Sequence, residues 1–407
     1  MTIENLNEKI KAYALKNAIQ YNGKANPGSV VSALFNEGLE KSGVREVMPK
    51  IQETIQEISK LSVEEMQVEF EKLEEFTSKR AERKGLPEIP NAENGIRTRF
   101  APSPSGAMHV GHALTASTAY AYVKKYGGKL ILRIEDTNAD NIYPQAYELL
   151  AEDGKWLFEN NCEVVVQSDR MDLYYEYARK LIDLDAAYIC ECSGDDFREL
   201  AKNKEDCPCR KNTKEENIAK WEKMLDSNGY APGEAILRFK TQESYQGMKN
   251  PNPAMRDFPL ARINLTTHPR QGNKYRVWPL MNLSVTTDDI EMKLTHIIRA
   301  KDHMDNAKRQ KMMFEVLEKP YPWDAYLGRW HIEGLRLSAS DFTKGIAEGK
   351  YSGWDDPELP TLQALAKKGY KPQAFHKIAE HRGLSEVDKK ITKEEFFQLL
   401  DEFNKAC

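Results

Sequence analysis

Long hydrophobic runs are missing from this sequence. No stretch approaches the roughly 18 apolar residues that a transmembrane helix requires. The first residues, MTIENLNEKIKAYALKN, contain acidic side chains and lack the apolar segment of a secretory signal peptide. These two absences argue against a membrane or secreted protein, and we expect a cytoplasmic location without membrane association.

A strong excess of one charge is also missing. The chain contains 59 Lys and Arg against 63 Asp and Glu, so its formal net charge is only −4. This balance excludes a basic nucleic-acid-binding arm or an acidic tail, and any contact with RNA has to use a local patch. Internal repeats are absent as well, and 407 residues are enough for roughly two to four domains.

Cysteine is scarce, with six residues in the chain, and four of them are clustered. Cys190, Cys192, Cys207 and Cys209 form two C-x-C pairs separated by 14 residues. Four thiolates satisfy the tetrahedral preference of Zn²⁺, and a set without an open position indicates a structural role. Free thiols or disulfides are the alternative. The two remaining cysteines stand alone, which favours a reducing compartment with one metal site.

Helical and strand-like segments divide the chain into regions. Charged, helically periodic sequence comes first, and strand-like and helix-like runs then alternate as in a parallel, doubly wound α/β sheet. A region with the cysteine cluster, a charged helix and short strands interrupts that alternation, so we interpret it as an insertion. The expected regions are an N-terminal helical domain at 1–88, a linker at 89–95, a doubly wound α/β core in two halves at 96–187 and 276–330, the inserted subdomain with its zinc site at 188–275, and a loop with a helical tail at 331–407.

The stretch TRFAPSPSGAMHVGHALTAS links an apolar strand to a helix and contains two histidines. With the strand KLILRIED it completes a βαβ unit, whose loop lies at a helix N-terminus, where free N–H groups and the helix dipole favour phosphate. His109 and His112 are one turn apart, and Gly111 between them lets a flat ligand approach the backbone. A single histidine here is more often a cap or a packed surface residue, but the pair predicts an ATP phosphate site.

The sequence APSPSGAMHVGHA resembles the signature loop of the class I aminoacyl-tRNA synthetases, with HVGH as its HIGH-type motif. Further segments, among them KYRVWP, THIIRAKDH and EGKYSGWDDPELPTLQAL, resemble archaeal and eukaryotic glutamyl-tRNA synthetases in the same order along nearly the whole chain. The resemblance implies the class I Rossmann-like fold, ATP and Mg²⁺, and zinc in the inserted subdomain that meets the tRNA acceptor end. It also implies a catalytic role for both histidines.

The resemblance further implies a pocket for the amino acid. Arg99 and Arg299 match positions that grip the substrate, and the planar fork of arginine suits a carboxylate. Ser103 and Glu135 match positions near the substrate carboxylate and ammonium respectively. Taken one at a time, these residues are equally compatible with strand-end salt bridges.

Two positions of this pocket depart from the family. Met281 stands where the family has a tyrosine, and Val285 where it has a small polar residue. The loss of hydrogen-bonding groups from a site that discriminates by them changes selectivity by orders of magnitude. Glutamate is the expected substrate, with a different amino acid as the alternative.

The segment GLRLSAS resembles the mobile KMSKS-type loop, whose cations bind the leaving pyrophosphate. Arg336 stands at the first lysine, and Ser338 and Ser340 keep the hydroxyls, so the resemblance implies that they bind ATP, with Arg336 and Ser338 in catalysis. The second lysine is replaced by alanine, and Asp341 follows the segment. An aspartate that faces phosphate repels it, whereas Lys344 can substitute for the missing lysine if the loop folds inward.

The sequence as given ends at Cys407, where the family continues into two β-barrels that read the anticodon. The expected function is an ATP-dependent ligase that forms a glutamyl-adenylate and transfers the glutamyl group to the 3′ end of tRNA. It would contact the acceptor end, with a separate protein supplying further RNA binding. Two alternatives remain open: adenylation of an amino acid for another acceptor (a modified base, a peptide or a carrier protein), and a non-catalytic paralogue that binds nucleotide or RNA.

Overall fold

The structure is a computed structural model that describes residues 3–21, 23–77 and 85–407. The chain divides into two compact units, residues 1–82 and residues 83–407. No helix among the described residues is long and apolar enough to cross a membrane. Residues 78–84, which fall in the predicted N-terminal domain, lie outside the described residues.

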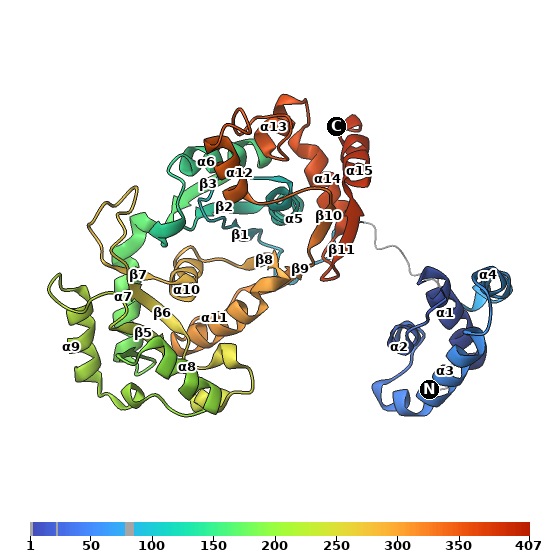
Figure 1. The fold of residues 1–407 in the computed structure, drawn as a ribbon, viewed down its shortest axis with the longest axis horizontal. Coiled ribbons are helices and arrows are strands. Elements are labelled where there is room, and N and C mark those ends of the chain that lie inside the picture. Colours follow the sequence, from blue (N-terminus) through green and yellow to red (C-terminus); the bar gives the residue numbers. More distant parts are fainter. Residues whose placement is uncertain (1–2, 22, 78–84) are drawn as a thin grey trace. The chain divides into compact units, whose positions relative to one another are not determined.

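The first unit is helical throughout its described residues, as Figure 1 shows. Its α-helices are α1 (Leu6–Gln20), α2 (Pro27–Asn36), α3 (Val44–Ile58) and α4 (Val63–Glu71). Asn26 caps α2 through its side chain, and Ser62 forms a capping box with Glu65 on α4, so these two helices start where the sequence supplies a cap. Helix α1 packs against the other three, and their apolar faces enclose a core around Ile10 and Leu34.

The second unit is built on parallel strands. These strands are β1 (Ile96–Phe100), β2 (Gly128–Ile134), β3 (Cys162–Val166), β8 (His296–Ala300) and β9 (Trp323–Leu327). Strands β1, β2 and β3 pair in that order, and β8 pairs with β9. The backbone N–H of Thr295, next to β8, donates to the carbonyl of Arg97 in β1 at 2.9 Å, so β8 lies beside β1. The predicted Rossmann-like core is confirmed.

Helices connect the parallel strands. They are α5 (Val110–Tyr126) between β1 and β2, α6 (Ala146–Leu157) between β2 and β3, α7 (Met171–Asp183) after β3, and α11 (Met304–Val316) between β8 and β9. Helix α5 ends before the glycine pair Gly127 and Gly128. Gly128 has a φ of 115°, and a Cβ there would lie 1.9 Å from the carbonyl oxygen of Ile96, so only glycine fits at this start of β2.

A four-stranded antiparallel sheet interrupts the parallel core (Figure 1), and it extends beyond the predicted insertion at 188–275, because its last strand lies at 277–279, in the segment expected to belong to the core. Its strands are β4 (Ala187–Cys190), β5 (Ile236–Phe239), β6 (Pro259–Ile263) and β7 (Val277–Pro279), accompanied by α8 (Gly194–Asn203) and α9 (Lys214–Leu225). Helix α10 (Met281–Glu291) follows β7 and packs against both α7 and α11. It therefore leads the chain from the antiparallel sheet back to the parallel core.

The C-terminal region is predicted to be a loop and a helical tail, and its helices are α12 (Ala339–Ala347), α13 (Leu362–Lys367), α14 (Pro372–Arg382) and α15 (Lys393–Lys405). It also contains β10 (Trp330–Glu333) and β11 (Lys389–Thr392), a parallel pair that sequence reasoning missed. Helix α14 packs against α5, and Phe375 and Ile378 belong to the same apolar core as Val110 and Leu114. The tail is thus part of the second unit.

Candidate active site

A cavity of about 600 Å³ opens where β1 and β8 end and α5 begins. The carboxyl ends of parallel strands meet at one edge of a sheet, which is where such folds bind ligands. Nine residues predicted from the sequence line this cavity: Arg99, Ser103, His109, Gly111, His112, Glu135, Met281, Val285 and Arg299. Four other predicted residues do not line it: Arg336, Ser338, Ser340 and Lys344.

The two histidines are held at the start of α5 by the helix backbone. The N–H of Gly111 donates to Nδ1 of His109 at 3.1 Å, and the N–H of His109 donates to Nδ1 of His112 at 3.4 Å. The rings stack with their centroids 3.9 Å apart. Burial lowers the pKa of His112 to about 4 and that of His109 well below its usual value. Both rings are therefore neutral near pH 7, and each offers an Nε2–H donor.

Gly111 is needed for close packing. A Cβ at this position would lie 3.0 Å from Cε1 of His109 and 3.3 Å from Cδ1 of Leu337. The space that a ligand would need to approach the Gly111 backbone is thus partly filled by the imidazole of His109 and by Leu337. Leu337 belongs to the second signature segment, GLRLSAS. This contact brings the two signature segments together at the cavity wall.

Asp153 anchors the loop that carries the histidines, and sequence reasoning missed it. This residue of α6 is buried, and its Oδ2 accepts a hydrogen bond of 2.6 Å from the N–H of Met108. Burial raises the pKa of Asp153 to about 8. The only sequence signal is an acidic residue on the apolar face of a predicted helix.

Two buried arginines also line the cavity. Arg299 donates from Nη1 to Gln310 at 2.8 Å and from Nη2 to the hydroxyl of Tyr321 at 2.9 Å. Arg99 lies with its Nε 3.6 Å from Oδ1 of Asp289. The Nε atoms of both arginines are buried and have no hydrogen-bond partner among the described residues. Both arginines line the cavity, and buried cations in a cavity wall are suited to an acidic ligand.

A buried ion-pair network lies behind these arginines. Arg133 donates from Nη1 to Asp289 at 2.6 Å and from Nη2 to Glu135 at 3.0 Å. Burial raises the pKa of Glu135, and the neighbouring charges of Arg133 and Arg99 act in the opposite direction. Sequence reasoning missed Arg133 and Asp289, although an arginine inside the apolar strand LILRIED is a visible signal.

The two positions that depart from the family both face this cavity. Val285 is buried on α10, whereas Met281 at the start of that helix is 39% exposed. Nδ2 of Asn306 lies 3.4 Å from the Met281 sulfur. The cavity wall is therefore apolar at these two positions.

The second signature segment lies outside the cavity except for Leu337. Arg336 forms an ion pair with Asp341 at 2.7 Å, and Ser338 caps α12 through the N–H of Asp341. Ser340 is exposed in the first turn of the helix, and Lys344 is 3.7 Å from Glu348. The predicted role of these groups at the phosphates requires a movement of the segment.

Residues 95–402 match the family model described as the catalytic domain of class I tRNA synthetases (E and Q). The chain belongs to this family. A glutamate–tRNA ligase of Methanocaldococcus jannaschii is 44% identical over 396 residues, which are 97% of this chain and 70% of the relative. A glutamate–tRNA ligase of Thermococcus kodakarensis is 41% identical over 400 residues, 96% of this chain and 69% of the relative.

Solved structures support the same fold for this synthetase. A crystal structure of a glutamate tRNA ligase from Elizabethkingia meningosepticum in complex with its amino acid superposes with a TM-score of 0.52. The match covers 76% of this chain and 69% of that chain at 20% identity. At this identity the likeness concerns the fold alone.

The clustered cysteines of this synthetase come together at the end of β4. Their four Sγ atoms lie within 4.8 Å of one another, with 3.5 Å from Cys207 to both Cys190 and Cys192 and 3.9 Å from Cys192 to Cys209. Four sulfurs at about 2.3 Å from a tetrahedral zinc are about 3.8 Å apart. The donor set and its spacing therefore fit zinc.

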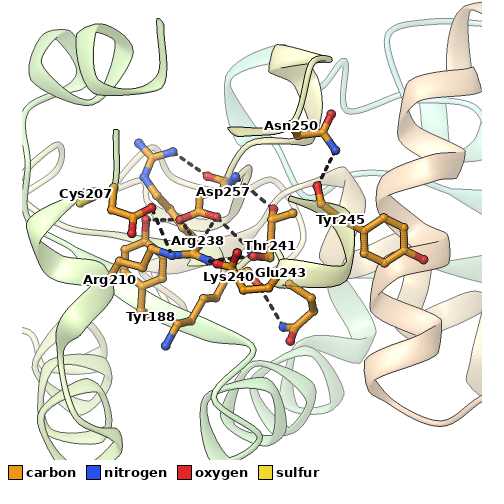
Figure 2. A network of polar contacts seen from close by, with 12 residues as sticks. Tyr188, Cys207, Arg210, Arg238, Lys240, Thr241, Glu243, Tyr245, Asn250 and Asp257 are labelled. Atoms are coloured by element: carbon orange, nitrogen blue, oxygen red, sulfur yellow. Dashed lines mark hydrogen bonds and ion pairs between the residues drawn. The ribbon is translucent and has the colours of Figure 1, made fainter. Parts of the chain in front are cut away.

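A buried network fastens the cysteine loops to the antiparallel sheet, as Figure 2 shows. Asp257 accepts from Nη1 of Arg210 at 2.6 and 2.7 Å and from the Tyr188 hydroxyl at 2.9 Å. Its Oδ1 also accepts from the N–H of Thr241 at 2.9 Å. Arg210 follows the last cysteine directly, so Asp257 fixes both the loop and the strand that carry the cluster.

Proposed function

We propose that this chain activates glutamate with ATP and joins it to the 3′ end of tRNA. The observation that carries this proposal is one cavity that combines two kinds of side chain. It is lined by two buried arginines, Arg99 and Arg299, and by a neutral histidine pair at the start of α5. The names of relatives that are 41% and 44% identical over nearly the whole chain support it.

The first step joins the α-carboxylate of glutamate to the α-phosphorus of ATP. The bond from that phosphorus to pyrophosphate breaks, so glutamyl-adenylate and pyrophosphate form. Negative charge grows on the phosphate oxygens, and the Nε2–H groups of His109 and His112 donate to them. Because both rings are already neutral donors, they need no proton transfer to act. Mg²⁺ accompanies ATP and offsets part of its charge.

The amino acid binds beside the two buried arginines in this proposal. Arg99 and Arg299 bind the side-chain carboxylate, Ser103 lies near it, and Glu135 accepts from the substrate ammonium. Met281 and Val285 form the apolar wall against the side-chain methylenes. A hydroxyl at the 3′ end of tRNA then attacks the acyl carbon, and AMP leaves.

The second signature segment completes the nucleotide site after it moves toward the cavity. Arg336, Ser338, Ser340 and Lys344 then bind the pyrophosphate. Leu337 of this segment already lies close to Gly111 of α5, so the segment is next to the cavity toward which it would move. KMSKS-type loops close in this way over bound nucleotide.

The cysteine cluster holds one structural Zn²⁺ in this proposal. Cys190, Cys192, Cys207 and Cys209 supply all four ligands, so the ion stabilises the subdomain and takes no part in the chemistry. The subdomain then presents its surface to the tRNA acceptor end.

Amino-acid-dependent ATP–pyrophosphate exchange tests the proposal. We expect exchange with glutamate in the presence of tRNA, and a loss of about 100-fold or more in Arg299→Met, which removes a charged hydrogen-bond donor from the pocket. Lys308→Met removes the same charge from the exposed face of α11, where Lys308 pairs with Asp305 at 3.0 Å, and should leave exchange unchanged. Absence of exchange with every amino acid would contradict the proposal.

A second candidate is adenylation of an amino acid for another acceptor. It is favoured by Met281 and Val285, since both line the cavity and neither can donate a hydrogen bond to glutamate. Exchange that is supported by a different amino acid, or by glutamate without tRNA, would favour this second function.

A further inference from the structure

Part of the cavity wall comes from a turn between two strands. Gly328 and Arg329, which connect β9 to β10, and Trp330, the first residue of β10, line the same cavity as His109, Gly111 and Leu337. In the proposed function we assign this turn to the part of the cavity that holds the nucleotide. Arg382, at the end of α14, lines the cavity as well.

The guanidinium of Arg382 contacts this turn, and no acidic side chain among the described residues pairs with it. Its Nη2 donates to the carbonyl oxygen of Gly328, and the guanidinium lies 5.8 Å from the centre of the Trp330 ring. Burial lowers the pKa of Arg382 to about 10, so the side chain stays charged near pH 7.

The segment that follows Arg382 holds the same turn from the other side. The N–H of Gly328 donates to the carbonyl of Ser385 at 2.8 Å. A Cβ on Gly328 would lie 2.2 Å from the carbonyl oxygen of Val387, so the two backbones touch and only glycine fits. The N–H of Arg329 donates to the carboxylate of Asp388 at 2.6 Å. Both polar groups of Gly328 are therefore fixed by the C-terminal segment.

We infer that Arg382 is a positioning residue for the nucleotide, which acts by holding the Gly328 carbonyl and the Gly328–Trp330 turn in the wall of the ATP site. The inference rests on the proposed function. An arginine that is partly buried without an acid costs folding free energy, and the Gly328 carbonyl is the acceptor that its guanidinium reaches. Because the turn contacts the nucleoside in this proposal, the effect of Arg382 does not depend on the phosphates.

The test compares nucleotide affinity in Arg382→Met, Arg382→Lys and the wild-type chain. Methionine keeps an apolar stem on Trp330 and removes the donor. We expect ATP and adenosine to bind about 10-fold more weakly to Arg382→Met, by the same factor for both, since one hydrogen bond from a charged group is lost. Arg382→Lys restores part of the affinity. The KM for glutamate stays unchanged in both variants, because Arg99 and Arg299 are untouched.

His381→Gln is the matched control. His381 is the neighbouring residue of α14, is exposed, and its ring packs at a tilted angle against Phe403; neither ring lines the cavity. This variant should bind ATP as the wild-type chain does, with melting temperatures recorded for all variants.

Three results would overturn the inference. Wild-type affinity in Arg382→Met would show that the contact is not used. An equal rise of the KM for ATP and for glutamate would indicate a purely structural role. A loss for ATP but not for adenosine would indicate a direct contact with phosphate. If the wild-type chain itself binds no ATP, the proposed function fails, which is a different result from normal binding in the variant.

Discussion

At the level of single residues, Arg336 already has an acidic partner when no phosphate is present. Asp341 lies 2.7 Å from it, and both side chains are solvent-exposed, at 38% and 76%. An exposed pair of this kind is weak and is screened by salt. Pyrophosphate therefore has to compete with Asp341 for the guanidinium, and the aspartate acts against the proposed chemistry.

Asp341→Asn should accelerate adenylate formation. We expect a rise of about 2- to 5-fold in pyrophosphate exchange at low salt, which shrinks as salt screens the pair. Glu348→Gln breaks the ion pair between Glu348 and Lys344 at the end of α12. This variant tests whether the loss of any ion pair at this helix accelerates exchange. A slower Asp341→Asn variant would mean that Asp341 holds Arg336 in a productive position.

At the level of elements, the position of α5 depends on α6. The buried carboxylate of Asp153 accepts from Met108, one residue before His109, and burial raises its pKa to about 8. In the unfolded chain this pKa is about 4. Between about pH 4 and about pH 8 the unfolded state therefore loses a proton that the folded state keeps, so this group lowers stability as pH rises.

Asp153→Asn should remove that pH dependence, since the amide oxygen can still accept from Met108 but does not titrate. We expect the free energy of unfolding of the wild-type chain to fall relative to the variant as pH rises through this window, by at most about 1.4 kcal/mol per pH unit. Urea unfolding of both proteins at several pH values checks the difference. Parallel pH profiles would show that Asp153 is ionised throughout.

At the level of the whole molecule, the catalytic unit combines three segments that are distant in the sequence. The parallel core carries the cavity, the antiparallel sheet carries the cysteine cluster, and the C-terminal region packs on α5 through α14. Asp257 and Arg210 connect the cysteine loops to the sheet, so loss of a zinc ligand should affect folding of this subdomain first.

Zinc content and stability test this arrangement. The wild-type chain should hold about one zinc per chain, and Cys207→Ser should hold none and melt several degrees lower, because metal binding contributes to folding free energy. Cys407→Ser, at an exposed cysteine outside the cluster, should change neither property. Equal stability of Cys207→Ser and the wild-type chain would contradict a structural zinc.

The sequence by itself determined the features that depend on neighbours along the chain. The helix cap at His109, the glycine pair after α5, the spacing of the cysteines and the alternation of strands and helices are local patterns, because caps, turns and burial periodicity are set within a few residues. These patterns are also the basis of the resemblance to the synthetase family. Nine of the residues predicted in this way line one cavity.

The tertiary structure decided which distant groups meet. Gln310 and Tyr321 orient Arg299, Asp153 anchors the histidine loop, and Arg382 reaches the Gly328 turn, yet none of these pairs has a characteristic spacing. Strand β11 was missed because a short charged segment becomes a strand only through pairing with β10. The outward position of Arg336 also follows from a contact, its ion pair with Asp341, that no local rule predicts. Long-range packing and buried charge pairs depend on the completed fold.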